Sequence, residues 1–189
     1  MPQLKLFMLL LGCRPPGRNT EQHDIFFGIG TSMKELVPAI KAFWPEAKNK
    51  LHVDAWREVT AVQNFSVTVV PKEANGSTAA TEPPFLFFLN LGGYKLQEFD
   101  EFHYKMLVVA ATQAEAIRQA RQTAFYKHTG FKGAPAHIDD KFGVDVDELY
   151  QVKEMLPEEV KQHYQVQLTP ATDLPADELH LGYFKLNSF

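Results

Sequence analysis

The sequence predicts an α+β protein formed by internal duplication of a β-β-α-β-β unit, with mainly antiparallel sheets and helices packed on one face. Two observations predict this class. The apolar run LFMLLLGC (Leu6–Cys13) returns 80 residues later as LFFLNLGG (Leu86–Gly93), with five of eight positions identical. At the same offset, Glu21–Glu35 matches Glu101–Glu115. Both matches indicate two copies of one ancestral unit.

The first copy reads as strand, polar loop, strand, helix and two further strands. Its first run is apolar throughout, which favours a strand covered on both faces. Ser32 and Glu35 have capping-box spacing, and Leu36, Ile40 and Phe43 make an apolar helical stripe. The segment FSVTVV alternates as a strand does. The predicted strands of this copy cover residues 4–11, 25–29, 51–59 and 65–70.

The second copy repeats this order, with strands expected at 85–91 and 105–110 and a capping box at Thr112 and Glu115. We expect the first unit over residues 1–72, a linker over 73–84 rich in Gly, Ser, Thr and Pro, and the second unit over 85–157. Residues 158–189 have no counterpart. They are expected to form a short helix and a strand packed on the second unit.

The first apolar run also looks like a lipoprotein signal ending at Cys13. Its uninterrupted part is shorter than a typical signal core of roughly 7–15 residues, and a segment repeated in mid-chain is not a cleaved signal. We therefore expect a strand. The chain has one cysteine and no Cys-x-x-Cys pair, which favours a reducing, cytoplasmic setting.

Composition limits the partners. The 189 residues carry 19 basic and 23 acidic side chains, a net charge of -4, so no nucleic-acid partner is expected. No apolar run approaches the roughly 20 residues that span a bilayer, so no membrane partner is expected either. A homodimer and a small anionic ligand remain open as partners.

Two short His/carboxylate motifs occur in both copies. Glu21 and His23 stand before the second strand, and His52 and Asp54 in the third, each pair two residues apart and so on one strand face. The equivalents in the second copy are Glu101, His103, His137 and Asp139. If the second and third strands are neighbours, each unit gathers two imidazoles and two carboxylates.

These groups have three interpretations. The simplest is a polar network in which carboxylates orient histidines. The others are a ligand or anion site and a divalent-metal site, for which two His and one or two carboxylates are suitable ligands. No metal is expected from the sequence. If one binds, its candidate ligands are Glu21, His23, His52 and Asp54.

Two loops carry basic residues beside glycines. The loop GCRPPGR contains Arg14 and Arg18, and HTGFKGA contains Lys132. Cations and backbone amides there are suited to hold a carboxylate or phosphate, although neither loop matches a P-loop. Ordinary turn formation is the simpler use of these glycines.

Several longer runs, among them TEQHDIFFGIG, HVDAWREV and TAFYKHTGFKGAPAHIDDKFGVD, resemble the bacterial domain of unknown function family 1543. The likeness covers about residues 4–70 and 85–157. The resemblance implies one or two copies of the domain and no assigned activity, cofactor or catalytic residue. The sequence therefore leaves two hypotheses: a module binding a small anionic ligand or a protein partner, and a metal-assisted hydrolase using the Glu-x-His and His-x-Asp pairs.

Overall fold

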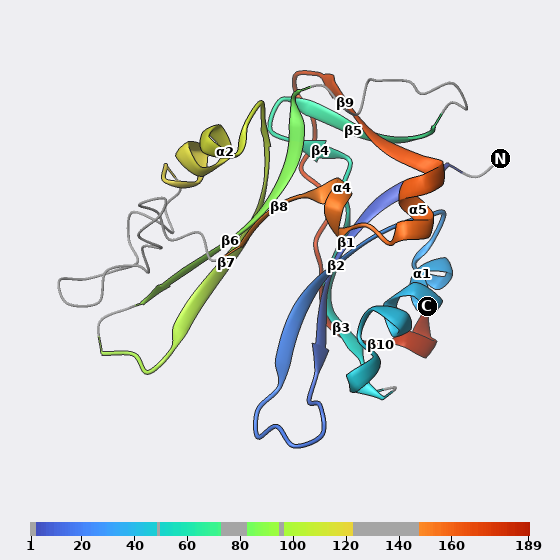
Figure 1. The fold of residues 1–189 in the computed structure, drawn as a ribbon, viewed down its shortest axis with the longest axis vertical. Helices are drawn as coiled ribbons and strands as arrows, with labels where there is room; N and C mark the ends of the chain where they lie inside the picture. The colour runs from blue at the N-terminus through green and yellow to red at the C-terminus, as the bar shows by residue number, and fades with distance from the viewer. Residues whose placement is uncertain (1–2, 49, 73–82, 95–96, 123–147) are drawn as a thin grey trace. The chain divides into compact units, whose positions relative to one another are not determined.

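The computed structural model describes residues 3–48, 50–72, 83–94, 97–122 and 148–189 (Figure 1). Two compact units divide the chain: Met1–Ala79 with Met155–Phe189, and Ala80–Glu154. The strand pairs in the described residues are antiparallel, and short helices accompany them. The predicted α+β class with mainly antiparallel sheets is confirmed.

The first unit contains a four-stranded sheet with the order β10-β3-β1-β2. Its strands are β1 (Lys5–Cys13), β2 (Gln22–Gly30), β3 (His52–Glu58) and β10 (His180–Lys185). The run LFMLLLGC lies in β1, which pairs with β2 on one side and β3 on the other. The side chains of Phe7, Leu9, Leu11 and Cys13 are buried in the core on one face of β1, and Met8 and Leu10 are partly buried on the other, which explains the unbroken apolar run.

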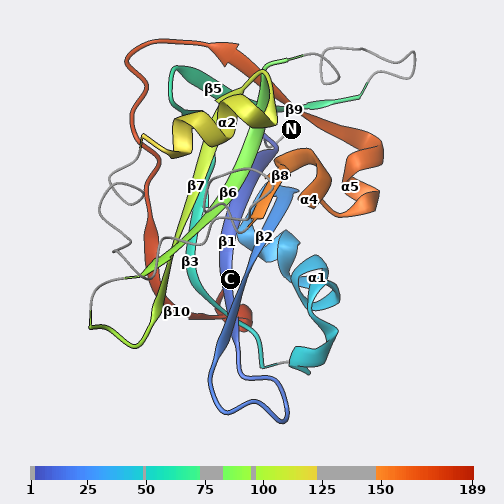
Figure 2. The ribbon, with the colours of Figure 1, turned by 60° about the vertical axis from the view of Figure 1, so that its left-hand side comes forward.

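Helix α1 (Met33–Phe43) packs on one face of this sheet (Figure 2). Leu36 and Ile40 are buried against alternate residues of β1, as the predicted stripe requires, whereas Phe43 is 40% exposed. The capping box is only half formed. The Glu35 carboxylate accepts hydrogen bonds from Thr31 N and Thr31 Oγ1, both at 2.7 Å, but the Ser32 hydroxyl makes no cap bond. The short 3-10 helix η1 (Pro45–Ala47) follows.

A second sheet of the first unit has the order β4-β5-β9. It contains β4 (Ala61–Val62), β5 (Phe65–Pro71) and β9 (Tyr164–Pro170). Helix α4 (Val152–Met155) lies where the chain passes from the second unit to the first, α5 (Glu158–His163) precedes β9, and the 3-10 helix η3 (Leu186–Ser188) follows β10. The expectation that residues 158–189 pack on the second unit is wrong. In this unit β9 pairs with β5 and β10 pairs with β3, so the C-terminal strands supply backbone partners to two strands of the first unit.

One buried carboxylate ties the C-terminal segment to the first unit. The side chain of Asp177 is 1% exposed, and its Oδ1 accepts hydrogen bonds from Thr60 N at 3.0 Å, Thr60 Oγ1 at 2.6 Å and Ala61 N at 3.2 Å. Arg57 Nη1 lies 3.7 Å from the other oxygen. These contacts satisfy the turn before β4, between segments more than 100 residues apart in the chain.

The second unit contains a three-stranded sheet with the order β7-β6-β8, the helix α2 and the first three residues of α4. Its elements are β6 (Phe85–Tyr94), β7 (Glu101–Ala110), α2 (Gln113–Ala120) and β8 (Glu148–Gln151). Here the N-cap hydroxyl makes its cap bond, and the Glu115 carboxylate reaches the residue before the N-cap. Thr112 Oγ1 accepts from Glu115 N at 3.2 Å, and Glu115 Oε2 accepts from Ala111 N at 2.9 Å.

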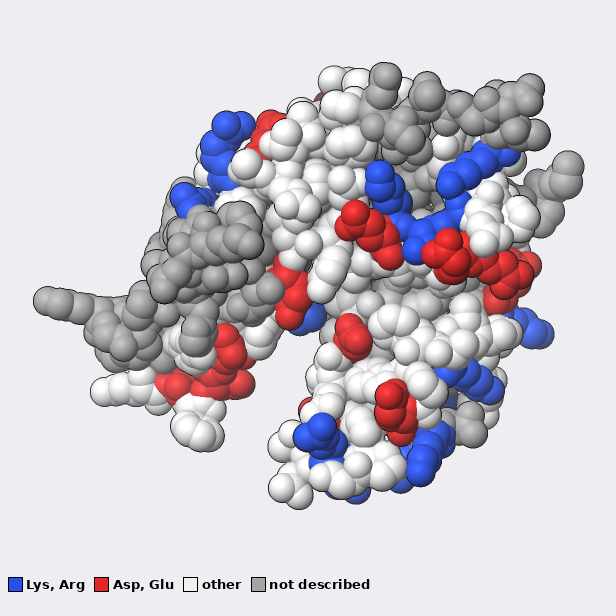
Figure 3. All heavy atoms as spheres, in the orientation of Figure 1, with Lys and Arg blue, Asp and Glu red and all other residues white. Residues whose placement is uncertain are grey.

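The surface of the view in Figure 3 carries acidic and basic side chains in small, interspersed groups. No helix of the described residues is both long enough and apolar enough to cross a membrane.

Candidate functional site

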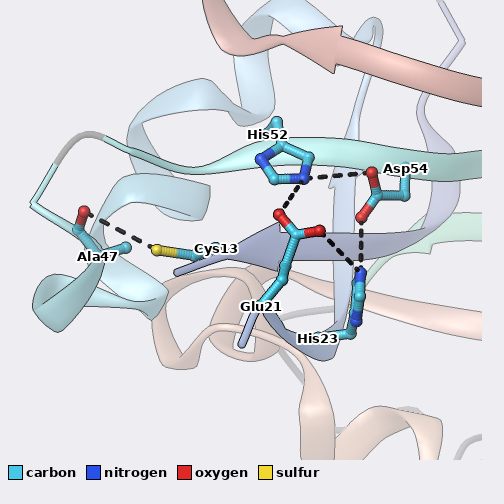
Figure 4. A network of polar contacts seen from close by, with 6 residues as sticks. All are labelled: Cys13, Glu21, His23, Ala47, His52 and Asp54. Carbon is cyan, nitrogen blue, oxygen red and sulfur yellow. Dashed lines mark hydrogen bonds and ion pairs between the residues drawn. The ribbon is translucent and has the colours of Figure 1, made fainter. Parts of the chain in front are cut away.

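Four polar side chains of the first unit meet on the sheet above β1: Glu21, His23, His52 and Asp54, hereafter the quartet (Figure 4). Glu21 immediately precedes β2, His23 lies in β2, and the other two lie in β3. From the sequence, these residues were expected to meet if the second and third strands are neighbours. That assumption is wrong, because β1 lies between β2 and β3.

The quartet forms nevertheless, because the residue of β1 between the two histidines is a glycine. The register places Gly12 opposite His23 on one side and opposite His52 on the other. A Cβ added to Gly12 would overlap His52 Nε2 and Asp54 Oδ2. A glycine is therefore required here by close approach, not by backbone conformation. Sequence analysis treated Gly12 only as a loop glycine and missed this role.

A bulge in β3 directs the aspartate. Leu10 pairs with Ala55 and Leu11 with Val53, so Asp54 is the additional residue between two ladder positions. Val53 is fully buried in the core beneath α1, which confirms that it faces away from the His52 side. Bulges re-aim side chains locally. This bulge accounts for the approach of Asp54 toward the β1 and β2 side of the sheet.

The short contacts of the quartet close into a ring. His52 Nε2 lies 3.1 Å from Glu21 Oε1 and 3.2 Å from Asp54 Oδ1. His23 Nε2 lies 3.1 Å from Asp54 Oδ2 and 3.9 Å from Glu21 Oε2. The Nε2 atom of each imidazole thus faces two carboxylates, and each carboxylate faces two imidazoles.

One side of the ring is buried and the other is open. The His52 side chain is 5% exposed and that of Asp54 26%, whereas Glu21 and His23 are 45% and 42% exposed. Among the described residues, neither ring nitrogen of His52 nor Asp54 Oδ2 has a hydrogen-bond partner, although the ring contacts are short. An unsatisfied buried polar group costs about 1–3 kcal/mol, so this arrangement calls for an explanation.

The described residues contain no group of three or more His, Cys, Asp or Glu side chains that stands ready to hold a metal ion. In their present orientation the members of the quartet contact one another instead. The donor types are nevertheless those of a transition-metal site: two imidazole nitrogens and two carboxylates.

The other predicted site residues lie elsewhere or outside the described chain. Arg14 and Arg18 are exposed in the loop joining β1 to β2. In β7, Glu101 is partly buried and His103 is exposed. His103 lies opposite Gly92 of β6, a pairing like that of His23 with Gly12. Lys132, His137 and Asp139 fall outside the described residues, so the second set of motifs is only half described.

Cys13 has the environment of a core residue. Its side chain is fully buried, and the thiol contacts Ala47 O at 3.9 Å. Burial raises the pKa of the Cys13 thiol. A raised pKa disfavours the thiolate, the form that acts as nucleophile or metal ligand.

Fold and site together define an α+β protein with a histidine-carboxylate cluster on one sheet face. Residues 18–69 match the model of the family described as Domain of Unknown Function (DUF1543), which confirms the resemblance over this stretch. All four residues of the quartet lie within it. No curated protein matches the chain.

A solved structure is similar along nearly the whole chain. It is the crystal structure of a protein, Il1583, from Idiomarina loihiensis. The identity is 25%, the similarity covers 97% of each chain, and the TM-score is 0.63. This likeness extends through both units and the C-terminal segment, well beyond the match to the family model.

Proposed function

We propose that the first unit is a binding module for a divalent transition-metal ion, with the quartet as its ligands. The observation that carries this proposal is the convergence of four donor groups around the buried imidazole of His52, whose ring nitrogens lie close to carboxylates without a well-formed hydrogen bond to any described residue. Buried polar side chains normally have partners, and imidazole nitrogens and carboxylate oxygens that converge on one point are the ligand set of metal ions such as zinc.

The spacing of the donors supports the proposal. In a tetrahedral site with metal-ligand distances of about 2.0–2.1 Å, adjacent donor atoms are about 3.3 Å apart. The four nitrogen-oxygen contacts of the quartet measure 3.1, 3.1, 3.2 and 3.9 Å. Glu21 and His23 are half-exposed and so are the two side chains with room to turn. Binding requires that turn, because the present orientation does not hold an ion.

Charge favours a cation over an anion at the quartet. Its two carboxylates face the same two imidazoles, and an imidazole that ligates a metal is in its neutral form. A divalent ion offsets both carboxylates and satisfies the ring nitrogens at once. The hypothesis of a small anionic ligand rests instead on Arg14 and Arg18, which are exposed in a neighbouring loop, and on Lys132, which falls outside the described residues.

Metal-assisted hydrolysis is the second candidate, and the one-sided exposure of the quartet favours it. Glu21 and His23 border solvent, so water can reach the bound ion from that side. For this reaction three residues, His23, His52 and Asp54, would hold the ion and leave a fourth position to water, whose pKa the metal would lower and whose proton Glu21 would accept. This reaction follows only if the ion binds.

The test is a titration of untagged, metal-free protein with Zn²⁺, Mn²⁺ and Co²⁺ by isothermal calorimetry. We expect saturable binding that Glu21→Gln and His52→Asn weaken by more than about 100-fold, since each removes a ligand. His163→Asn, an exposed histidine of α5, is the matched control and is expected to bind as the wild type does. A wild type without saturable binding of any of these ions would refute the proposal.

We also propose that the two units arose by duplication and that the second unit has an equivalent site. The registers support this: Lys5 pairs with Gly30 and Phe85 with Ala110, both partners displaced by 80 residues. The Gly92 and His103 pairing adds to it. Two binding equivalents, one of them lost in Glu101→Gln and the other in Glu21→Gln, are the expected result. One equivalent that only Glu21→Gln removes would count against the second site.

A further inference from the structure

We propose that Tyr183 is a positioning residue of the cation site, which fixes the plane of the His52 imidazole by stacking on it. The inference rests on the proposed function of the quartet. The two rings lie with their centroids 4.2 Å apart and their planes at 29°. Tyr183 belongs to β10, in the C-terminal segment, and so comes from a part of the chain about 130 residues distant from His52.

The orientation of His52 needs such a contact. A metal-ligating histidine is usually fixed by a hydrogen bond from its second ring nitrogen to a carboxylate, a carbonyl or water. Among the described residues, His52 Nδ1 has no hydrogen-bond partner. Besides the Nε2 contacts with the two carboxylates, the ring is held by packing, with its Nε2 edge over Gly12 and its face against Tyr183.

An irregularity in the backbone of β10 places Tyr183 against His52. The register of β10 on β3 shifts between Leu181 and Phe184, and Gly182 in the shift has a φ of +144°, which favours glycine. Phe184 then packs against the core cluster of the first unit, whereas Tyr183 is 65% exposed. Tyr183 therefore contributes little to that core, and its stack on His52 is the contact that the irregular strand provides.

The test compares Co²⁺ binding by the wild type, Tyr183→Ala and Tyr183→Phe, followed by calorimetry and by the visible bands of bound Co²⁺. We expect Tyr183→Ala to weaken Co²⁺ binding by about 10-fold, the lower end of the range for residues that orient a ligand, and to alter the bands. Tyr183→Phe retains the stacked ring and is expected to match the wild type. Leu181→Ala, an exposed residue of the same strand, is the matched control.

A second measurement needs no metal. The ring proton signals of His52, assigned by their loss in His52→Asn, are expected to be displaced by the Tyr183 ring current in the wild type and Tyr183→Phe, and not in Tyr183→Ala. Unfolding of each variant in urea shows whether the change is confined to the site.

The outcomes separate the two proposals. A wild type that binds none of Co²⁺, Zn²⁺ and Mn²⁺ overturns both. If the wild type binds Co²⁺ and Tyr183→Ala binds it equally tightly, only the role of Tyr183 is overturned. That role is also overturned if Leu181→Ala loses as much affinity as Tyr183→Ala, because the strand rather than the ring is then responsible, or if Tyr183→Phe behaves as Tyr183→Ala does.

Discussion

Replacing Gly12 by alanine is the most direct test of how the quartet is built. The new methyl group would occupy the space of His52 Nε2 and Asp54 Oδ2. Asp54 has some room to move, but the His52 side chain is 5% exposed and is covered by Tyr183, so it has no open space to turn into. The methyl therefore either separates the histidines or displaces β1 from β3.

The expected loss of stability follows from overpacking. An additional methyl in a well-packed site costs about 1–3 kcal/mol. For a chain of this length, a loss of about 2 kcal/mol lowers the melting temperature by about 4–8 °C. The substitution should reduce the free energy of cation binding by more than it reduces the free energy of unfolding. The reason is that it moves two ligands at once and leaves the rest of the sheet in place.

Gly30→Ala is the matched control at the opposite end of the same hairpin. A Cβ there would meet Leu36 Cδ2 at 3.1 Å and Glu35 Oε2 at 3.3 Å, a tight but smaller conflict that is remote from the quartet. Scanning calorimetry and metal titration of both variants are the assays. We expect Gly30→Ala to lose some stability and keep cation binding. If Gly12→Ala melts and binds as the wild type does, the histidines do not meet over Gly12 and the reasoning is refuted.

Three further predictions concern the surroundings of the site. Native Cys13 should react with a thiol reagent at about pH 8 far more slowly than in urea, because burial raises its pKa; equal rates would contradict its place in the core. Hydrogen bonds from the Thr31 amide and hydroxyl lower the pKa of Glu35, so its stabilisation is present above about pH 4.3 and lost as the pH falls through the folded pKa. The difference in urea midpoint between wild type and Glu35→Gln should therefore shrink from about pH 6 to about pH 3, and a constant difference would contradict this. Asp177→Ala removes the acceptor of three hydrogen bonds at Thr60 and its neighbour and should cost about 2–3 kcal/mol in urea unfolding, whereas an unchanged midpoint would show that the C-terminal segment is held by other contacts.

Local sequence patterns predicted the helices and strands because the spacing of apolar residues in each element reflects which of its side chains are buried. The apolar run of β1, the helical stripe at Leu36 and Ile40, and the alternation of β5 all became the expected strand or helix. The hydroxyl and carboxylate spacing predicted both helix starts as well. At Ser32, however, the side-chain hydrogen bond itself is absent, because spacing does not determine a side-chain rotamer.

The partners of the strands were harder to predict. An edge strand takes whichever strand has a matching face and enough chain to reach it, and several candidates satisfy both conditions. Thus β9 joins β5 and β10 joins β3, across separations of about 100 residues or more, although proximity in sequence favoured the second unit. The contribution of Tyr183 to the site depends on this long-range pairing, and no local pattern indicated it.

The quartet shows why a search for reactive residues finds only part of a site. The spacing of Glu21 with His23 and of His52 with Asp54 placed each pair on one strand face, and the structure brings both pairs together. The two pairs can meet because Gly12, which lies between them, has no side chain. Gly12 of LFMLLLGC has its equivalent in Gly92 of LFFLNLGG, and each lies opposite the histidine of a Glu-x-His motif. The recurrence of this glycine and of the Glu-x-His motif in both repeats was visible in the sequence. The role of the glycine could not be inferred from it, because that role depends on β1 lying between β2 and β3. The glycine becomes informative only when strand order is known, since a residue without a side chain matters where two neighbouring strands must reach across it.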